Sequence, residues 1–240
     1  MSLGSSHGNW ENRNRMKTIK TNGIYHLSPV GNSHIWYWGT DHTGGDLYEA
    51  AELYKARHPF SKNRAVYVRF PEGRLIEPVI AKEGQYFGVP SLYHADIIYT
   101  LLVDFPQNEI HILAFNPDEV LDGAAVQTVA ILPLWIADDC YNLLLKTAPV
   151  MLTRQSSDNY FQILWTETNG LMDIGFQIKE HESFSHAEGE ILYFHNWWEK
   201  EEPVYEYHEE TISRNLRGEI LERINGGIFE VHPQKYWILE

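Results

Sequence analysis

The chain has 240 residues, 43% of them hydrophobic, and a net charge of −14 with histidine neutral. This apolar and aromatic content excludes general disorder, and the length suits one large β domain. The charge disfavours nucleic acid and anionic membranes as partners, because phosphates are bound through clustered Lys and Arg. No apolar run approaches the roughly 20 residues of a membrane helix, so we expect a soluble protein.

Residues 1–15 are rich in Gly, Ser and Asn and show no hydrophobic period. Met1-Ser2-Leu3 resembles a cloning leader, and Met16 fits a native start. We therefore expect residues 1–15 to be a disordered leader and residues 16–240 to form a single β domain. The lone Cys140 excludes an intrachain disulfide, and its apolar neighbours predict a buried thiol. Together these features favour a reducing compartment, most simply a cytoplasm of bacterial type.

In chain order, the first predicted elements are two strands within residues 23–39, followed by a polar loop over residues 41–46. Residues 47–57 have helical hydrophobic spacing, with Asp46 as N-cap and Glu49 three residues later. From residue 64 onward, short strand patterns dominate. We expect strands over 65–70, 74–81, 85–89, 97–105, 109–116, 126–132, 141–146, 150–154, 160–166, 172–178, 190–195, 204–208, 218–224, 227–232 and 236–239.

Groups of these strands recur roughly every 40–50 residues, which is the length of a propeller blade. In period and strand pattern the chain resembles β-propeller proteins. The resemblance implies an all-β fold of about five blades, with the one short helix at 47–57, closed by pairing of 236–239 with 24–27. An irregular β-sandwich is the alternative that the pattern leaves open.

The segment 36–46 puts aromatic residues at a strand end and carboxylates with a histidine on the following loop. Such loops often carry sites, and aromatic faces with carboxylates suit sugar recognition. The ligand-binding candidates here are Trp36, Trp38, Asp41, His42 and Asp46. The alternative is a glycine turn in which Asp46 only caps the helix.

A second candidate site is the segment 195–199, which we expect to follow a strand and to open an acidic loop. Adjacent tryptophans on a loop cannot both face one core, and an exposed Trp often marks a binding surface. His195, Trp197 and Trp198 are therefore binding candidates. Alternatively, one indole covers the interior and the other packs on a neighbouring blade.

Three carboxylates, Asp41, Asp104 and Glu190, are the catalytic candidates for a glycoside hydrolase, in which paired carboxylates act as acid and base. Asp104 ends an apolar run, and its alternative role is to accept backbone hydrogen bonds at a turn. His94 and Asp96 form a possible oriented base, although a plain turn also explains them.

The twelve histidines include no recognised ligand spacing. His181 and His186 flank a predicted polar loop over residues 180–190, where a transition metal would have imidazole and carboxylate ligands. The alternative, which we favour, is that these are solvated loop residues, and we predict no metal. Phosphate-loop, Gly-x-Gly-x-x-Gly and Gly-x-Ser-x-Gly patterns are missing, so no cofactor is predicted.

The sequence thus favours a module that binds a small molecule, such as a sugar, or a protein partner. The alternative is a carbohydrate-active enzyme with carboxylates in a central cleft. An aromatic cluster on the surface would favour the first interpretation, and converging carboxylates would favour the second.

Overall fold

The computed structural model describes residues 17–31, 33–41, 47–58, 64–88, 91–120, 125–138, 140–146, 149–232 and 234–240. Within these residues there are nineteen β-strands, two short α-helices and one 3-10 helix. The protein is therefore mainly β, as predicted. The strands form five antiparallel sheets, numbered here sheet 1 to sheet 5 in chain order.

Sheets 1 and 2 contain the first half of the chain. Sheet 1 has the order β1-β2-β3-β4, and α1 (Leu47–Lys55) lies between β2 and β3 in the sequence. Sheet 2 has the order β5-β7-β8-β9, and β6 also pairs with β7. The bounds are β1 (Ser28–Pro29), β2 (Trp36–Thr40), β3 (Ala65–Arg69), β4 (Arg74–Ile76), β5 (Gln85–Phe87), β6 (Leu92–His94), β7 (Ile97–Asp104), β8 (Glu109–Phe115), α2 (Pro117–Val120), β9 (Gln127–Pro133) and the 3-10 helix η1 (Leu134–Ala137).

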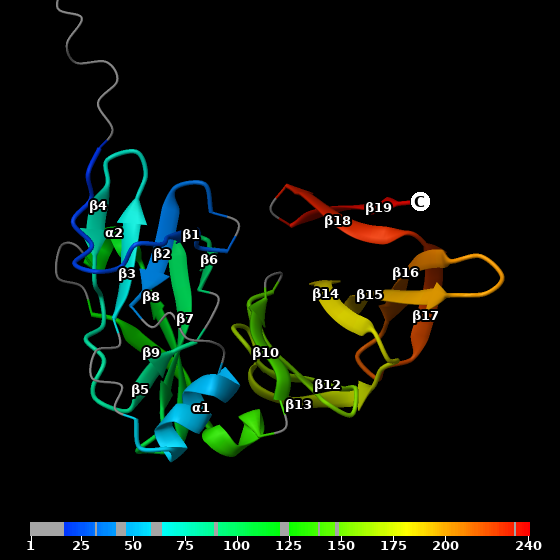
Figure 1. Cartoon of the computed structure of the whole chain (residues 1–240), viewed down its shortest axis with the longest axis horizontal. Helices are drawn as coiled ribbons and strands as arrows, with labels where there is room; N and C mark the ends of the chain where they lie inside the picture. Colours follow the sequence, from blue (N-terminus) through cyan, green and yellow to red (C-terminus); the bar gives the residue numbers. More distant parts are fainter. Residues whose placement is uncertain are drawn as a thin grey trace, which may run out of the picture.

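Sheets 3 and 4 are four-stranded meanders, and sheet 5 is a two-stranded hairpin. Figure 1 shows the sheets following one another around the molecule, with sheets 1 and 2 at the left and sheet 5 at the top. The bounds are β10 (Cys140–Lys146), β11 (Met151–Ser156), β12 (Tyr160–Thr166), β13 (Gly170–Gln177), β14 (Glu182–Glu188), β15 (Ile191–Lys200), β16 (Glu206–Arg214), β17 (Ile220–Asn225), β18 (Gly227–His232) and β19 (Lys235–Leu239).

Strand β7 explains why sheet 2 is covered on both faces. Successive side chains of a strand point to opposite faces, and here both faces are apolar. Tyr99, Leu101 and Val103 pack in a cluster shared with sheet 3, whereas Ile98 and Leu102 pack in a cluster shared with sheet 1. A nearly continuous apolar run is the pattern expected of a strand buried on two sides.

Sheet 3 repeats this arrangement toward sheet 4. Leu152 belongs to the cluster shared with sheet 2, and its neighbour Met151 belongs to a cluster shared with sheet 4. That second cluster is rich in phenylalanine, and the rings of Phe161 and Phe194 meet edge to face at 5.0 Å. Sheets 1 to 4 are therefore held together by three apolar clusters, each of which is shared by two consecutive sheets.

Sheet 5 continues directly from sheet 4. The backbone N–H of Gly226 donates to the carbonyl oxygen of Glu209 at 2.9 Å, and the Thr211 hydroxyl donates to the carbonyl oxygen of Gly226 at 2.9 Å. Gly226 has a φ of 112°, and an added Cβ would lie 2.3 Å from the Leu239 carbonyl oxygen. This turn therefore requires glycine.

The structure corrects four predictions about the strands. The predicted closing pair is wrong, because residues 24–27 form no strand and β19 pairs with β18 alone among the described residues. The predicted polar loop 180–190 is instead mostly β14. The predicted loop at 195–199 is wrong as well, because β15 continues through Lys200. Its partner β16 begins at Glu206 and extends to Arg214, well beyond the predicted strand 204–208.

The helix predicted at 47–57 is confirmed as α1, which ends two residues earlier. The leader 1–15, Met16 and the Cys140 side chain lie outside the described residues. Neither α1 nor α2 has the length or the apolar character of a membrane-crossing helix, and the described residues contain no other candidate.

Candidate functional site

A cavity of about 300 Å³ lies where the five sheets converge. Sheet 1 contributes to its lining through the turn after β1, sheet 2 through β6, sheet 3 through β10 and sheet 4 through β14. Both strands of sheet 5 and their connection supply the remainder. The lining residues are Gly31, Leu92, Tyr93, Leu145, Lys146, Ser185, Ile228, Glu230, Gln234 and Tyr236. Its volume is in the range of small-molecule sites, and its lining is divided between apolar and polar residues.

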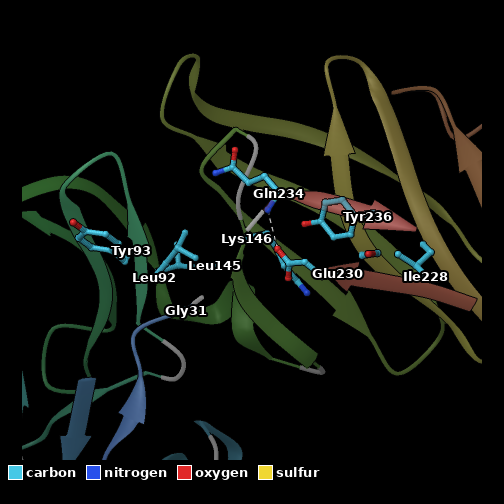
Figure 2. Close-up of a pocket in the computed structure, with 10 residues that line it drawn as sticks. Gly31, Leu92, Tyr93, Leu145, Lys146, Ile228, Glu230, Gln234 and Tyr236 are labelled. Atoms are coloured by element: carbon cyan, nitrogen blue, oxygen red, sulfur yellow. Dashed lines mark hydrogen bonds between the residues drawn. The ribbon is translucent and has the colours of Figure 1, made fainter. Parts of the chain in front are cut away.

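Lys146 is the cation of this cavity. It is the last residue of β10, where it pairs with Met151 of β11, and it follows Leu145, which packs in the cluster between sheets 2 and 3. Figure 2 shows Lys146 drawn beside Glu230, Gln234 and Tyr236, with Leu92 and Tyr93 on the other side of the cavity. Burial lowers the pKa of the Lys146 amine, and the Glu230 carboxylate partly opposes this change.

Glu230 and Tyr236 are held together on sheet 5, where they are cross-strand partners in the register of β18 and β19. The backbone N–H of Gln234 donates to Glu230 Oε1 at 2.9 Å. Burial, with the neighbouring Glu230 carboxylate, raises the pKa of Tyr236 to about 12. The Tyr236 phenol therefore keeps its proton and remains a hydrogen-bond donor near neutral pH.

His186 lies behind this cavity, in a stack of three rings. Its imidazole is parallel to the Tyr236 ring at a centroid distance of 3.4 Å and to the Tyr193 ring at 4.8 Å. Its Nδ1 is 3.0 Å from the hydroxyl of Ser185, which lines the cavity. Burial lowers the pKa of His186 to about 4, against the opposite effect of Glu230, and the charge of Lys146 lowers it further. The imidazole is consequently neutral near pH 7.

The β6–β7 hairpin connects the cavity rim to sheet 5. The Tyr93 hydroxyl donates to Asp96 Oδ1 at 2.8 Å, and burial together with Asp96 raises the pKa of Tyr93 to about 12. The Gln234 amide lies 3.0 Å from His94 Nδ1. The oriented base suggested by the sequence pairs His94 with Asp96, but His94 contacts Gln234 and Asp96 accepts from Tyr93, so the hairpin geometry favours the turn role.

The tryptophans predicted at the first site lie in the core. Trp36 is fully buried and Trp38 is 7% exposed, and both belong to the cluster between sheets 1 and 2. They are strand residues of β2, and neither of them lines the cavity. His42 and Asp46 lie outside the described residues.

The second predicted set lies on the β15–β16 ribbon. The His195 imidazole is 3.5 Å from the Glu209 carboxylate. Trp197 stacks near His181 at 4.1 Å, and Trp198 stacks on His208 at 5.2 Å. Trp198 is 40% exposed, as expected for one of two adjacent indoles, but the ribbon supplies none of the residues that line the cavity.

The three predicted catalytic carboxylates belong to different sheets, and the cavity lining includes none of them. Asp41 continues the β2–β3 ladder, where its Oδ1 accepts from the backbone N–H of Arg64 at 2.8 Å. Asp104 accepts from the backbone N–H of Gln107 at 3.0 Å, which is the turn role weighed above, and from the Gln85 amide at 2.6 Å. Glu190 is exposed in the turn between β14 and β15.

The two candidate metal-ligating histidines lie at different places relative to β14. His181 precedes the strand and lies on Trp197, whereas His186 is buried in the ring stack. In the described parts of the chain no group of three or more His, Cys, Asp or Glu residues is arranged to hold a metal ion.

Sequence reasoning missed the cavity because its members are residues of ordinary type, one or two from each of several strands and turns far apart in the chain. One usable signal was Lys146, a lysine that ends the apolar run Leu143-Leu144-Leu145. Charged residues are rarely buried without a reason. A scan against models of known protein families and a search of curated proteins both find no match to this chain.

Proposed function

We propose that this protein binds a small polar organic molecule in the cavity between its five sheets. The observation that carries the proposal is the convergence of Lys146, Glu230 and Tyr236 in one pocket whose lining is partly polar and partly apolar. The Lys146 amine and the Tyr236 hydroxyl supply donors, and Glu230 supplies an acceptor. Leu92, Leu145 and Ile228 supply the apolar surface that favours an organic ligand over an inorganic ion.

We also propose that the five sheets are the blades of an open, five-bladed propeller-like ring. Three features support this arrangement: the sheets are antiparallel, they pack in chain order, and each of them contributes a strand or a connecting turn to the cavity lining. In propellers, blades of about four strands surround a central channel. Sheet 5 has two strands here, so the proposed ring is incomplete at that blade.

The carbohydrate-active enzyme has less support from this geometry. Glycoside hydrolysis uses two carboxyl groups about 5–9.5 Å apart, and Glu230 is the one carboxylate among the described residues that line the cavity. Sugars nevertheless belong in the ligand screen, because Tyr93 offers a ring at the cavity wall. Binding without hydrolysis is what the site supports.

A thermal-shift screen tests the binding proposal. Small sugars, carboxylic acids, amino acids and carbonyl compounds are added singly to the full chain. A ligand at 100 times its Kd stabilises the folded state by about 2.7 kcal/mol. We expect at least one compound to raise the unfolding temperature of the wild type, and Lys146→Met and Glu230→Gln to abolish that increase.

The matched controls are Lys200→Met and Glu206→Gln. These residues form an exposed pair at 3.9 Å on the β15–β16 ribbon, and their replacement should leave the ligand effect unchanged. The proposal fails if no compound stabilises the wild type, or if the cavity variants and the control variants respond to the ligand alike.

A further inference from the structure

Lys146 differs from every other lysine that the structure describes. Lys17, Lys20, Lys55, Lys82, Lys179, Lys200 and Lys235 are exposed, and Lys146 alone is partly buried. Several of the exposed lysines have an ion-pair partner, as Lys179 has in Glu210 at 3.1 Å. Among the described residues, no carboxylate oxygen lies within 4.0 Å of the Lys146 amine nitrogen, so Lys146 forms no ion pair with them.

An amine that is withdrawn from water without a close partner is costly unless it loses its proton or meets a ligand. The Lys146 side chain lines the cavity beside Glu230, Gln234 and Tyr236 (Figure 2), and the apolar part of the lining consists of Leu92, Leu145 and Ile228. Burial lowers its pKa, and each unit by which a pKa falls gives about tenfold more neutral amine at a pH below it. Neutral lysine amines in apolar pockets are nucleophiles toward carbonyl carbon.

We propose that Lys146 forms an imine with a small aldehyde or ketone that enters this cavity. The inference deepens the proposed function, on which it rests, because the cavity must first admit a small organic molecule. It names the class of ligand as a carbonyl compound and the attachment point as Lys146 Nζ.

The chemistry balances without an oxidant or a reductant. The Nζ lone pair attacks the carbonyl carbon, and the electrons of the C=O π bond move to oxygen. Transfer of a proton from nitrogen to that oxygen gives a carbinolamine. The C–O bond then breaks, water leaves with a second proton from nitrogen, and a C=N bond forms. Glu230 and Tyr236 line the same cavity, and they are the groups through which these protons move.

Reductive trapping tests the proposal on the full-length wild type. Glyoxylate and propionaldehyde serve as separate probes near pH 7, each with and without sodium cyanoborohydride, and the product is digested and mapped by mass spectrometry. We expect one dominant secondary amine, at Lys146, formed faster than an adduct at any exposed lysine, because burial lowers the pKa of the Lys146 amine. Without the reductant, the adduct should be lost on dilution.

Two variants sharpen this test. Lys146→Arg keeps the positive charge but forms no stable imine, so the dominant adduct should disappear. Lys235→Arg changes an exposed lysine next to Tyr236, and the adduct at Lys146 should persist. If Lys146→Arg does not fold, the site map of the wild type still decides the question.

The outcomes separate this inference from the proposed function. Adducts spread evenly over the exposed lysines, or no adduct at Lys146, would overturn the imine. If a compound from the thermal screen still depends on Lys146 and Glu230 in that case, non-covalent binding stands and only the imine is wrong. If no compound stabilises the protein and Lys146 stays unmodified, both proposals fail.

Discussion

A buried ion pair within sheet 4 joins Glu182 at the start of β14 to Arg214 at the end of β16. The pair is bidentate, with Arg214 Nε 2.7 Å from Glu182 Oε1 and Arg214 Nη2 2.8 Å from Oε2. Glu182 is fully buried, and the Arg214 side chain is 7% exposed. The guanidinium also donates to the Gly218 carbonyl at 2.7 Å, and its Cζ lies 5.8 Å from the Phe194 ring centre.

Removing either member should destabilise the fold strongly. A buried charge that loses its partner costs about 3–5 kcal/mol, and folded domains have a total stability of only about 5–15 kcal/mol. We expect Glu182→Leu and Arg214→Met each to lower the free energy of unfolding by about 3–5 kcal/mol. The double variant should lose much less than the two losses combined, because it leaves no unpaired charge.

Urea unfolding measures these changes, followed by tryptophan fluorescence and by circular dichroism, with the slope checked for constancy. The matched control is the exposed pair Lys55–Glu52 at 3.0 Å on α1, for which we expect a coupling below about 1 kcal/mol. The reasoning is refuted if either single variant at Glu182 or Arg214 costs less than about 1 kcal/mol, or if the double variant is additive.

Three further changes have expected outcomes. Burial lowers the pKa of folded His186 to about 4, so between pH 6.5 and pH 4 the unfolded chain binds a proton at this residue and the folded chain does not. The free energy of unfolding, measured from urea midpoints over this range, should therefore fall by up to about 3 kcal/mol. His186→Phe should remove this loss. Gly218→Ala should lower the free energy of unfolding by about 2–4 kcal/mol, because φ is 81° and a Cβ would lie 2.4 Å from Phe176. Gly189→Ala, where a Cβ would meet open space, should lower it by about 1 kcal/mol. Equal losses of the two variants in thermal melts would contradict this prediction. Asp104→Ala should lower the free energy of unfolding, measured with urea, by about 1–3 kcal/mol. The increase in unfolding temperature that a cavity ligand causes should remain unchanged.

Strand β14 shows where sequence reasoning failed and why. Its residues Glu182-Ser-Phe-Ser-His-Ala-Glu are polar enough to predict a loop, yet Glu182, Phe184 and His186 are buried. Each buried polar member depends on a residue distant in the chain: Glu182 on Arg214, and His186 on Tyr236. Local hydrophobicity contains no information about such partners, so the pattern of polar residues was misleading there.

The prediction for the β15–β16 ribbon was wrong for a related reason. The segment 195–199 was expected to leave the sheet because adjacent tryptophans and glutamates suit a loop. In the structure the ladder continues to the pair Lys200↔Glu206, and cross-strand contacts such as Trp198 on His208 stabilise it. The number of residues that pair depends on the partner strand, which sequence spacing alone did not reveal.

The sequence by itself determined that the chain is mainly β, that α1 lies near its start, and that strands such as β7 and β8 lie within residues 97–105 and 109–116. These features follow from local side-chain chemistry and from the two-residue period of a strand. Only the tertiary structure decided which sheets pack together and that Lys146 shares a cavity with Glu230 and Tyr236. The physical reason is that the site consists of a few residues from each of five sheets and their turns, brought together by packing that no local pattern encodes.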